Sequence, residues 1–367
     1  MHRTARRLIP VLALSPVAAG IVLTAPAADA ARPPATPRPI VHDAADTTPE
    51  QRVVKKFWTP AKMAAAKPLD LVRTRGGRTT VAPSGAGMII TPGSAGPRRA
   101  DAEPSPAPST APPPVTASPT PSASASPSPS PTAASVVSAR SPGASWTAGG
   151  AIAKTEGRVF FTYQGRSASC SGTAVTSANK SVVITAGHCV KLGGAFHTNW
   201  VFVPGYNAGA RPYGTWVATN LLTTPQWNAS EDMNYDMAAA VVAPLNGESL
   251  TDVVGGQGVA FNQARGRQMY AFGYPAASPY DGSRLVYCSG RVFEDYLIST
   301  DQGLTCDMTG GSSGGGWFLS FNERTGTGTL NSVNSFKYNF APYWMFGPYF
   351  GPEAQAVYTA AQNADAT

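Results

Sequence analysis

The chain has 367 residues and a net charge of +7, but the basic excess is unevenly distributed. Residues 1–145 carry 16 Lys and Arg against 7 Asp and Glu, whereas residues 146–367 carry 12 against 14. The basic charge therefore lies outside the part that we expect to fold as a domain, and it gives no reason to expect a nucleic-acid partner.

Residues 1–30 have the pattern of a secretory signal peptide. A basic segment at residues 3–7 precedes an interrupted apolar stretch, and the small residues 28–30 end it. This order predicts cleavage after Ala30 and export to the extracellular space. A membrane anchor is the alternative, but proline and glycine interrupt the run, which is short for the about 20 apolar residues that a span needs.

Two segments of unusual composition follow. Residues 31–101 are rich in Ala, Pro and Arg and are expected to be a disordered pro-segment, with one more ordered stretch at residues 53–69. Residues 102–145 are nearly all Pro, Ser, Ala and Thr, a composition typical of a disordered linker. We expect the pro-segment to assist folding or to shield the functional site until it is removed near residues 140–150.

Residues 146–367 have a different pattern. Short apolar or alternating runs are separated by clusters of Gly, Asn, Pro and Ser, and helical periodicity is nearly absent before the C-terminus. This pattern predicts an all-β domain. Its length fits two packed antiparallel six-stranded β-barrels, closed by a C-terminal helix that begins near Pro352.

All four cysteines lie in this domain. An even number in an exported chain, with no Cys-x-x-Cys pair, favours disulfides over a metal site. Three pairings are possible, and the short loops favour Cys170–Cys189 and Cys288–Cys306. We therefore expect neither a metal nor another cofactor.

Ser313 lies in the glycine-rich stretch 310–316 and has the frame Gly-x-Ser-Gly-Gly. Glycine neighbours let the backbone turn sharply and leave space for a substrate, as a serine nucleophile requires. The backbone N–H groups of Gly311 and Ser313 would then form an oxyanion hole. Ser312 is the competing candidate, but the frame places the nucleophile at Ser313.

The expected general base is His188, which adjoins Cys189 at the end of an apolar run. A serine hydroxyl must lose its proton as it attacks, and an imidazole is the usual acceptor. The domain has one other histidine, His197, which we expect to be solvent-exposed in a polar loop.

The expected orienting acid is Asp236, which comes directly before the apolar run 237–242. Glu231 and Asp232 are alternatives, but both lie in the preceding polar loop. With Asp236, the catalytic types follow one another along the chain in the order His, Asp, Ser.

These motifs resemble those of the chymotrypsin-fold (trypsin-like) serine peptidases, and within them the secreted bacterial glutamyl endopeptidase-like branch. The matching stretches are Thr-Ala-Gly-His-Cys at 185–189, Tyr-Asp-Met-Ala at 235–238 and residues 306–314. The resemblance covers residues 146–367. It implies a double β-barrel with the active site between the barrels.

The resemblance also implies a substrate pocket formed by Asp307, Thr309, Asn334 and Ser335. Asp307 matches the spacing of the trypsin-type pocket acid, which would favour Arg or Lys in the substrate; the alternative is a structural role. Glutamyl endopeptidases carry a histidine where this chain has Asn334, so a preference for glutamate is not implied. Ser335 resembles the serine that supports the catalytic aspartate. Ser312 stands where trypsin-type enzymes carry an activating acid.

These features predict a secreted serine endopeptidase that is made as a precursor, acts as a monomer on protein or peptide substrates, and works at neutral to alkaline pH. The alternative is a catalytically silent protease-fold binding module on a Pro/Ser-rich stalk. An esterase of the α/β-hydrolase type would need the order Ser, acid, His, which is absent.

Overall fold

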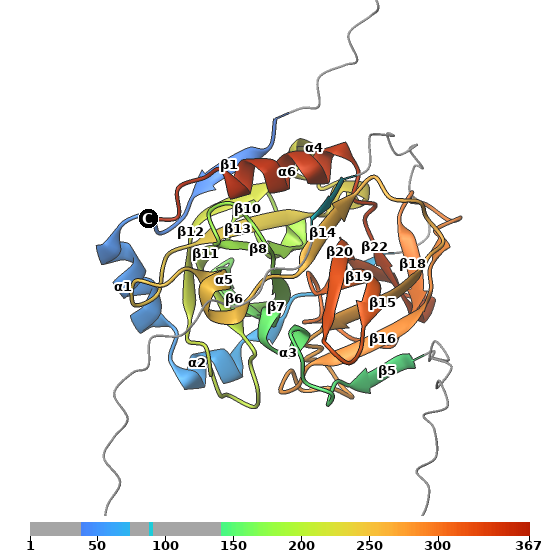
Figure 1. The fold of residues 1–367 in the computed structure, drawn as a ribbon, viewed down its shortest axis with the longest axis horizontal. Coiled ribbons are helices and arrows are strands. Elements are labelled where there is room, and N and C mark those ends of the chain that lie inside the picture. Colours follow the sequence, from blue (N-terminus) through green and yellow to red (C-terminus); the bar gives the residue numbers. More distant parts are fainter. Residues whose placement is uncertain (1–37, 74–87, 91–140) are drawn as a thin grey trace, which may run out of the picture. The chain divides into compact units, whose positions relative to one another are not determined.

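Strands joined by short turns dominate the computed structural model, which describes residues 38–73, 88–90 and 141–367 (Figure 1). The expected all-β class, with a closed six-stranded barrel and a C-terminal helix, is confirmed. The expected signal peptide and most of the expected linker lie outside these residues. Within the described ranges, no helix is long and apolar enough to cross a membrane.

The first barrel is a closed ring of antiparallel strands. They pair in the order β12-β11-β6-β7-β8-β13, and β13 pairs back with β12. All five residues of β13 are buried alanines and valines, whose small side chains allow the C-terminal helix α6 (Pro352–Gln362) to pack closely on the barrel. The strands are β6 (Glu156–Tyr163), β7 (Arg166–Ala174), β8 (Val182–Thr185), β11 (Thr198–Pro204), β12 (Trp216–Thr223) and β13 (Ala238–Val242).

The second half contains two sheets around a shared core. Their orders are β4-β14-β20-β19-β15-β16-β5 and β17-β18-β22-β21-β3, where β3 (Leu71–Arg73) and β4 (Met88–Ile90) precede the domain in the chain. Buried side chains of both sheets, such as Trp317 and Met345, form one apolar cluster. The strands contributed by residues 141–367 are β5 (Ser141–Ser145), β14 (Gly258–Phe261), β15 (Gln268–Gly273), β16 (Val286–Arg291), β17 (Phe293–Glu294), β18 (Gln302–Thr305), β19 (Gly316–Asn322), β20 (Thr327–Val333), β21 (Phe336–Tyr338) and β22 (Ala341–Gly347). Strand β5 lies entirely within the range 102–145 that the composition assigned to a disordered linker, so that expectation is wrong for residues 141–145.

Short elements and two disulfides complete the domain. Cys170–Cys189 and Cys288–Cys306 are both formed, with Cα–Cα distances of 6.2 and 5.5 Å. The remaining elements are β9 (Lys191–Leu192), β10 (Ala195–Phe196), α3 (Ile152–Thr155), α4 (Pro225–Ser230), α5 (Leu250–Val254), α6 (Pro352–Gln362) and the 3-10 helices η1 (Gly187–Cys189) and η2 (Met233–Tyr235).

Part of the expected pro-segment is ordered: the more ordered stretch expected at residues 53–69 lies within it, and the expectation of disorder is wrong for residues 38–52, 70–73 and 88–90. Buried apolar side chains, including Trp58 and Met63, hold this part against the first barrel, where the blue helices lie in Figure 1. Its elements are β1 (Ile40–Asp43), α1 (Thr48–Phe57), α2 (Pro60–Ala65), β2 (Lys67–Pro68), β3 (Leu71–Arg73) and β4 (Met88–Ile90). The other residues of the pro-segment lie outside the described ranges.

A buried carboxyl group joins the two halves. Glu156 on β6 accepts hydrogen bonds from the Thr173 hydroxyl at 2.6 Å and from the backbone N–H of Gly316 at 3.2 Å. Burial raises the pKa of Glu156 to about 8, because the charged form loses its hydration. The group is therefore protonated in the folded protein over a pH range in which the unfolded chain has released the proton.

We expect Glu156→Gln to flatten the pH dependence of stability. Between the ordinary pKa of 4.5 and the folded value of about 8, the folded state holds a proton that the unfolded state lacks. The free energy of unfolding therefore falls as pH rises, by up to about 1.4 kcal/mol per pH unit from this group. Urea unfolding from pH 5 to pH 8 measures the slope. Glu294→Gln, at an exposed position, is the control, and equal slopes in all three proteins would contradict the prediction.

Candidate active site

His188 lies on η1, directly after barrel strand β8. A Cβ at Gly187 would lie 2.7 Å from Cγ of Trp227 and 2.9 Å from Oδ1 of Asp236, so glycine is needed for this turn to approach the aspartate. The imidazole is fully buried, and its Nδ1 lies 2.8 Å from Oδ2 of Asp236. Its Nε2 has no hydrogen-bond partner among the described residues, which leaves this nitrogen able to accept a proton.

Three hydrogen bonds fix the Asp236 carboxylate between η2 and β13. The backbone N–H of His188 donates to Oδ1 at 2.8 Å, and the Ser335 hydroxyl donates to Oδ2 at 2.5 Å, beside the His188 ring. Ser335 follows β20 in the second half, so the carboxylate joins the two halves at this point. A carboxylate held in this way orients the imidazole and stabilises its protonated form.

The other candidate acids and the second histidine have different roles. The side chain of Glu231 accepts from Gly194, and that of Asp232 accepts from Asn234 at the start of η2. The prediction that His197 is solvent-exposed is wrong. Its ring is buried, stacks on Phe161 at 4.4 Å and contacts the carbonyl of His188 at 2.9 Å. Burial lowers the pKa of His197 to about 4.

Ser313 lies on the glycine-rich turn that precedes β19. Gly311 and Gly314 have φ values of +95° and +81°, which L-residues rarely adopt, and a Cβ at Gly314 would lie 2.0 Å from Oγ1 of Thr185. The turn therefore depends on glycine for both its shape and its close approach to the first barrel. The Ser312 hydroxyl is buried and donates to the carbonyl of Thr309 at 2.8 Å, so it is turned into the protein.

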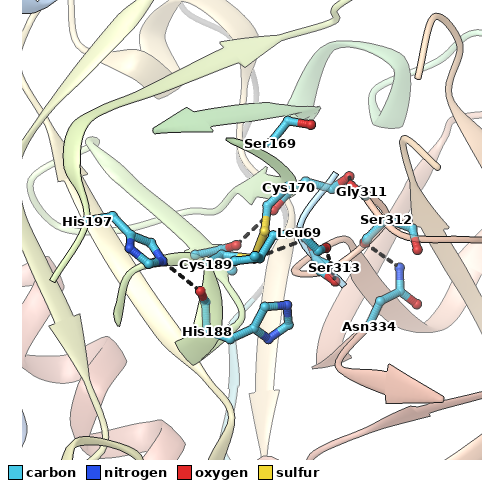
Figure 2. Close-up of a disulfide and its surroundings, with 12 residues drawn as sticks. Leu69, Ser169, Cys170, His188, Cys189, His197, Gly311, Ser312, Ser313 and Asn334 are labelled. Carbon is cyan, nitrogen blue, oxygen red and sulfur yellow. Dashed lines mark hydrogen bonds between the residues drawn. A yellow bond between two sulfur atoms is a disulfide. The ribbon is translucent and has the colours of Figure 1, made fainter. Parts of the chain in front are cut away.

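A segment preceding the domain occupies the space beside Ser313. The Ser313 hydroxyl donates to the carbonyl oxygen of Leu69 at 3.3 Å, and the backbone N–H of Gly311 donates to the same oxygen at 3.4 Å. Figure 2 shows Leu69 and Ser313 beside the Cys170–Cys189 disulfide, together with His188. The Leu69 carbonyl thus uses the N–H group that the sequence assigned to the oxyanion hole.

The same segment is held on both sides of Leu69. Before it, β2 pairs with β7, and the backbone N–H of Leu69 donates to the carbonyl of Ser169 at 3.0 Å. After it, β3 lies parallel to β21 and ends where the N–H of Asn339 donates to the carbonyl of Arg73. Asp70 packs against Gly310, and burial raises the pKa of its carboxyl group.

Comparisons with known proteins show which structures the chain is similar to. No family model matches the chain. The structure is similar to the protease Anisep from Arthrobacter nicotinovorans, with 48% identity, a TM-score of 0.56 and coverage of 57% of this chain and 96% of that one. It is also similar to the thermostable serine protease AL20 from an extremophilic microorganism, with 42% identity, a TM-score of 0.56 and coverage of 59% and 100%. The chain belongs to the chymotrypsin-fold serine proteases.

A curated relative shares a shorter stretch with this chain. The extracellular metalloprotease of Bacillus subtilis (strain 168) is 37% identical over 71 residues. These residues amount to 19% of this chain and 22% of the relative, so the chain matches less than a quarter of that protein's length.

In the described ranges, the side chains of Cys170, His188 and Cys189 lie close enough together to act as ligands of one metal ion. Both sulfur atoms belong to the Cys170–Cys189 disulfide. A thiolate is the form of cysteine that binds a metal, so this group does not form a metal site while the disulfide is intact.

The predicted pocket residues separate into two groups. Asn334 is fully buried: its amide donates to the carbonyls of Phe272 and Ser312 and accepts from the indole of Trp317. Its polar atoms are therefore used inside the protein, where they brace the backbone next to Ser313. Ser335 contacts Asp236, as described above.

Asp307 and Thr309 are half-buried. Asp307 accepts from the Tyr280 hydroxyl at 2.7 Å, and Thr309 donates to the carbonyl of Ala277 at 2.7 Å. Lys337 was not predicted from the sequence. Its Nζ donates to the carbonyls of Cys306 and Pro342. Burial lowers the pKa of Lys337 to about 8, and the negative charges of Asp307 and Asp70 oppose this shift.

We expect Ser335→Ala to lower kcat with little change in KM. The variant loses a hydrogen bond to the carboxylate that orients His188, and bonds of this kind contribute enough for a loss of about tenfold to a hundredfold. Peptide hydrolysis by the protein freed of its pro-segment measures both constants. The control is Ser230→Ala, on an exposed helix end. An unchanged kcat in Ser335→Ala would show that Ser335 is not needed to position the aspartate.

Proposed function

We propose that the protein is a secreted serine endopeptidase that is made as a precursor and cleaves proteins or peptides through a His188–Asp236–Ser313 triad. The observation that carries the proposal is the buried His188 imidazole, held at Nδ1 by Asp236 and without a partner at Nε2 among the described residues. A neutral imidazole held in this way can accept the proton that the nucleophile loses as it attacks.

In the proposed reaction, Ser313 Oγ attacks the substrate carbonyl carbon and its proton passes to Nε2 of His188. The C=O bond becomes a C–O⁻ bond, and the N–H groups of Gly311 and Ser313 donate to that oxyanion. His188 then gives the proton to the leaving amine as the C–N bond breaks, which leaves an acyl-enzyme on Ser313. Water repeats the sequence and releases the acid.

Secretion and the domain boundaries form part of the same proposal. Residues 1–30 would be the signal peptide, 31–101 the pro-segment, 102–145 the linker and 146–367 the protease domain. The two disulfides support an oxidising compartment, because such bonds rarely persist in the cytosol. The occupied space beside Ser313 supports a precursor that is inactive until the pro-segment leaves.

Cleavage-site profiling on a mixed peptide library tests the function. We expect the protein without its pro-segment to cleave peptides. Ser313→Ala should lower the cleavage rate at least about a thousandfold, as removal of a triad residue does in other serine proteases. Ser312→Ala is the matched control one residue away and should retain cleavage, because its hydroxyl is turned into the protein. If Ser312→Ala is inactive and Ser313→Ala is active, the assignment of the nucleophile is wrong. If no form cleaves any peptide, the silent binding module is favoured instead.

A further inference from the structure

The exposed apolar side chains of the domain lie together at one place. Within residues 141–367, every large apolar side chain that is exposed lies on the loop between β17 and β18 or on the hairpin of β21 and β22. These side chains, which we call the aromatic surface, are Tyr296, Leu297, Phe340, Tyr343 and Trp344; Tyr296 and Tyr343 are 82% and 70% exposed. Proteins rarely expose large apolar groups side by side unless the groups bind a partner.

The aromatic surface contains a hollow of about 600 Å³. Neighbouring rings hold its walls in place, because Phe340 stacks on Tyr338 at 5.1 Å and Trp344 meets Phe293 edge to face at 5.3 Å. The hollow is large enough to take an aromatic side chain of a ligand. Its lining residues are Leu297, Phe340, Ala341, Pro342, Tyr343 and Trp344.

The edge of β21 leads from the turn of Ser313 to the aromatic surface. β3 lies on this edge, and its pairing ends where the N–H of Asn339 donates to the carbonyl of Arg73, directly before Phe340. Arg73 is four residues after Leu69, whose carbonyl contacts Ser313. A polypeptide that adds to the same edge as an extended strand therefore reaches the aromatic surface with about the fifth to seventh residue from the carbonyl at Ser313.

The chain's own continuation does not match the aromatic surface. Residues 74–80, which follow β3, are only Thr, Arg and Gly. They offer no aromatic or large aliphatic side chain to the hollow. The occupant that matches is therefore another polypeptide, which uses the edge of β21 and carries a large apolar side chain at the corresponding position.

We propose that the aromatic surface is a second substrate-binding site, which holds an aromatic or large aliphatic side chain about five to seven residues from the bond that is cut. The inference rests on the proposed function, because it presumes that polypeptides are cleaved at Ser313. It narrows the substrate class to extended polypeptides that carry an apolar residue at this distance, which short peptides do not reach.

The test uses the full chain, folded and then freed of its pro-segment. Its substrates are two pairs of peptides around one cleavable core, with Trp or Ala about six residues before the cut in one pair and about six residues after it in the other. The ratio of kcat/KM for the Trp peptide to that for the Ala peptide is compared within each protein. Tyr343→Ser and Leu297→Ser alter the hollow from its two loops, and Ser230→Ala on α4 is the control.

We expect the ratio to be at least about fivefold for one of the two pairs, mainly through a lower KM, because a distant contact binds the substrate and takes no part in the bond change. The ratio should fall below about twofold in Tyr343→Ser and in Leu297→Ser, and stay at the wild-type value in Ser230→Ala. If one of the two variants fails to fold, the other decides.

Equal kcat/KM for Trp and Ala peptides, in an enzyme that cleaves both, would overturn this inference and leave the proposed function intact. A high ratio that persists in both hollow variants would overturn it as well, since the contact would then lie elsewhere. A dimer found by light scattering that Tyr343→Ser dissociates would show that a second copy of the chain covers the surface, and the inference would be wrong. Failure of every form to cleave any peptide would overturn the proposed function, and this inference with it.

Discussion

The carboxylate of Asp236 receives hydrogen bonds from the backbone and ring of His188 and from the hydroxyl of Ser335, all in a site closed to solvent. A buried carboxylate is stable only when its oxygens are satisfied, so each donor constrains the position of the other two. The first barrel supplies His188 and Asp236, and the second half supplies Ser335. The relative placement of the two halves therefore determines the orientation of the imidazole.

The same junction carries the other features that the proposed chemistry needs. Gly314 lets the turn of Ser313 approach Thr185 on β8, and Asn334 holds the backbone of that turn from behind. Glu156 on β6, protonated in its buried position, accepts a hydrogen bond from Gly316, which begins β19 directly after this turn. Leu69 lies across the finished site. Assembly of the site and its occlusion therefore use the same surfaces, which fits the proposed precursor.

Much of this arrangement could be predicted from local sequence, because motifs such as Thr-Ala-Gly-His-Cys and Gly-Gly-Ser-Ser-Gly report the residue types that a tight turn and a nucleophile require. The C-terminal helix was predicted for a similar reason. Besides the position of Lys337, three features could not be predicted. The burial of His197 depends on its stacking on Phe161 of β6. The role of Asn334 depends on its hydrogen bond to Ser312, 22 residues away in the chain. The position of Leu69 depends on its backbone hydrogen bond to Ser169. Each is a contact between distant residues that leaves no periodic or compositional signal.

A crystal structure of the protein with a peptidyl boronic acid tests the central claim most directly, because boron forms a tetrahedral adduct with an activated serine that resembles the reaction intermediate. Our account predicts a bond from boron to Oγ of Ser313, a boronate oxygen that accepts from the N–H groups of Gly311 and Ser313, and displacement of Leu69 from this place. A bond to Ser312 or to another residue, or an adduct that forms while Leu69 keeps its contact with Gly311, would contradict it.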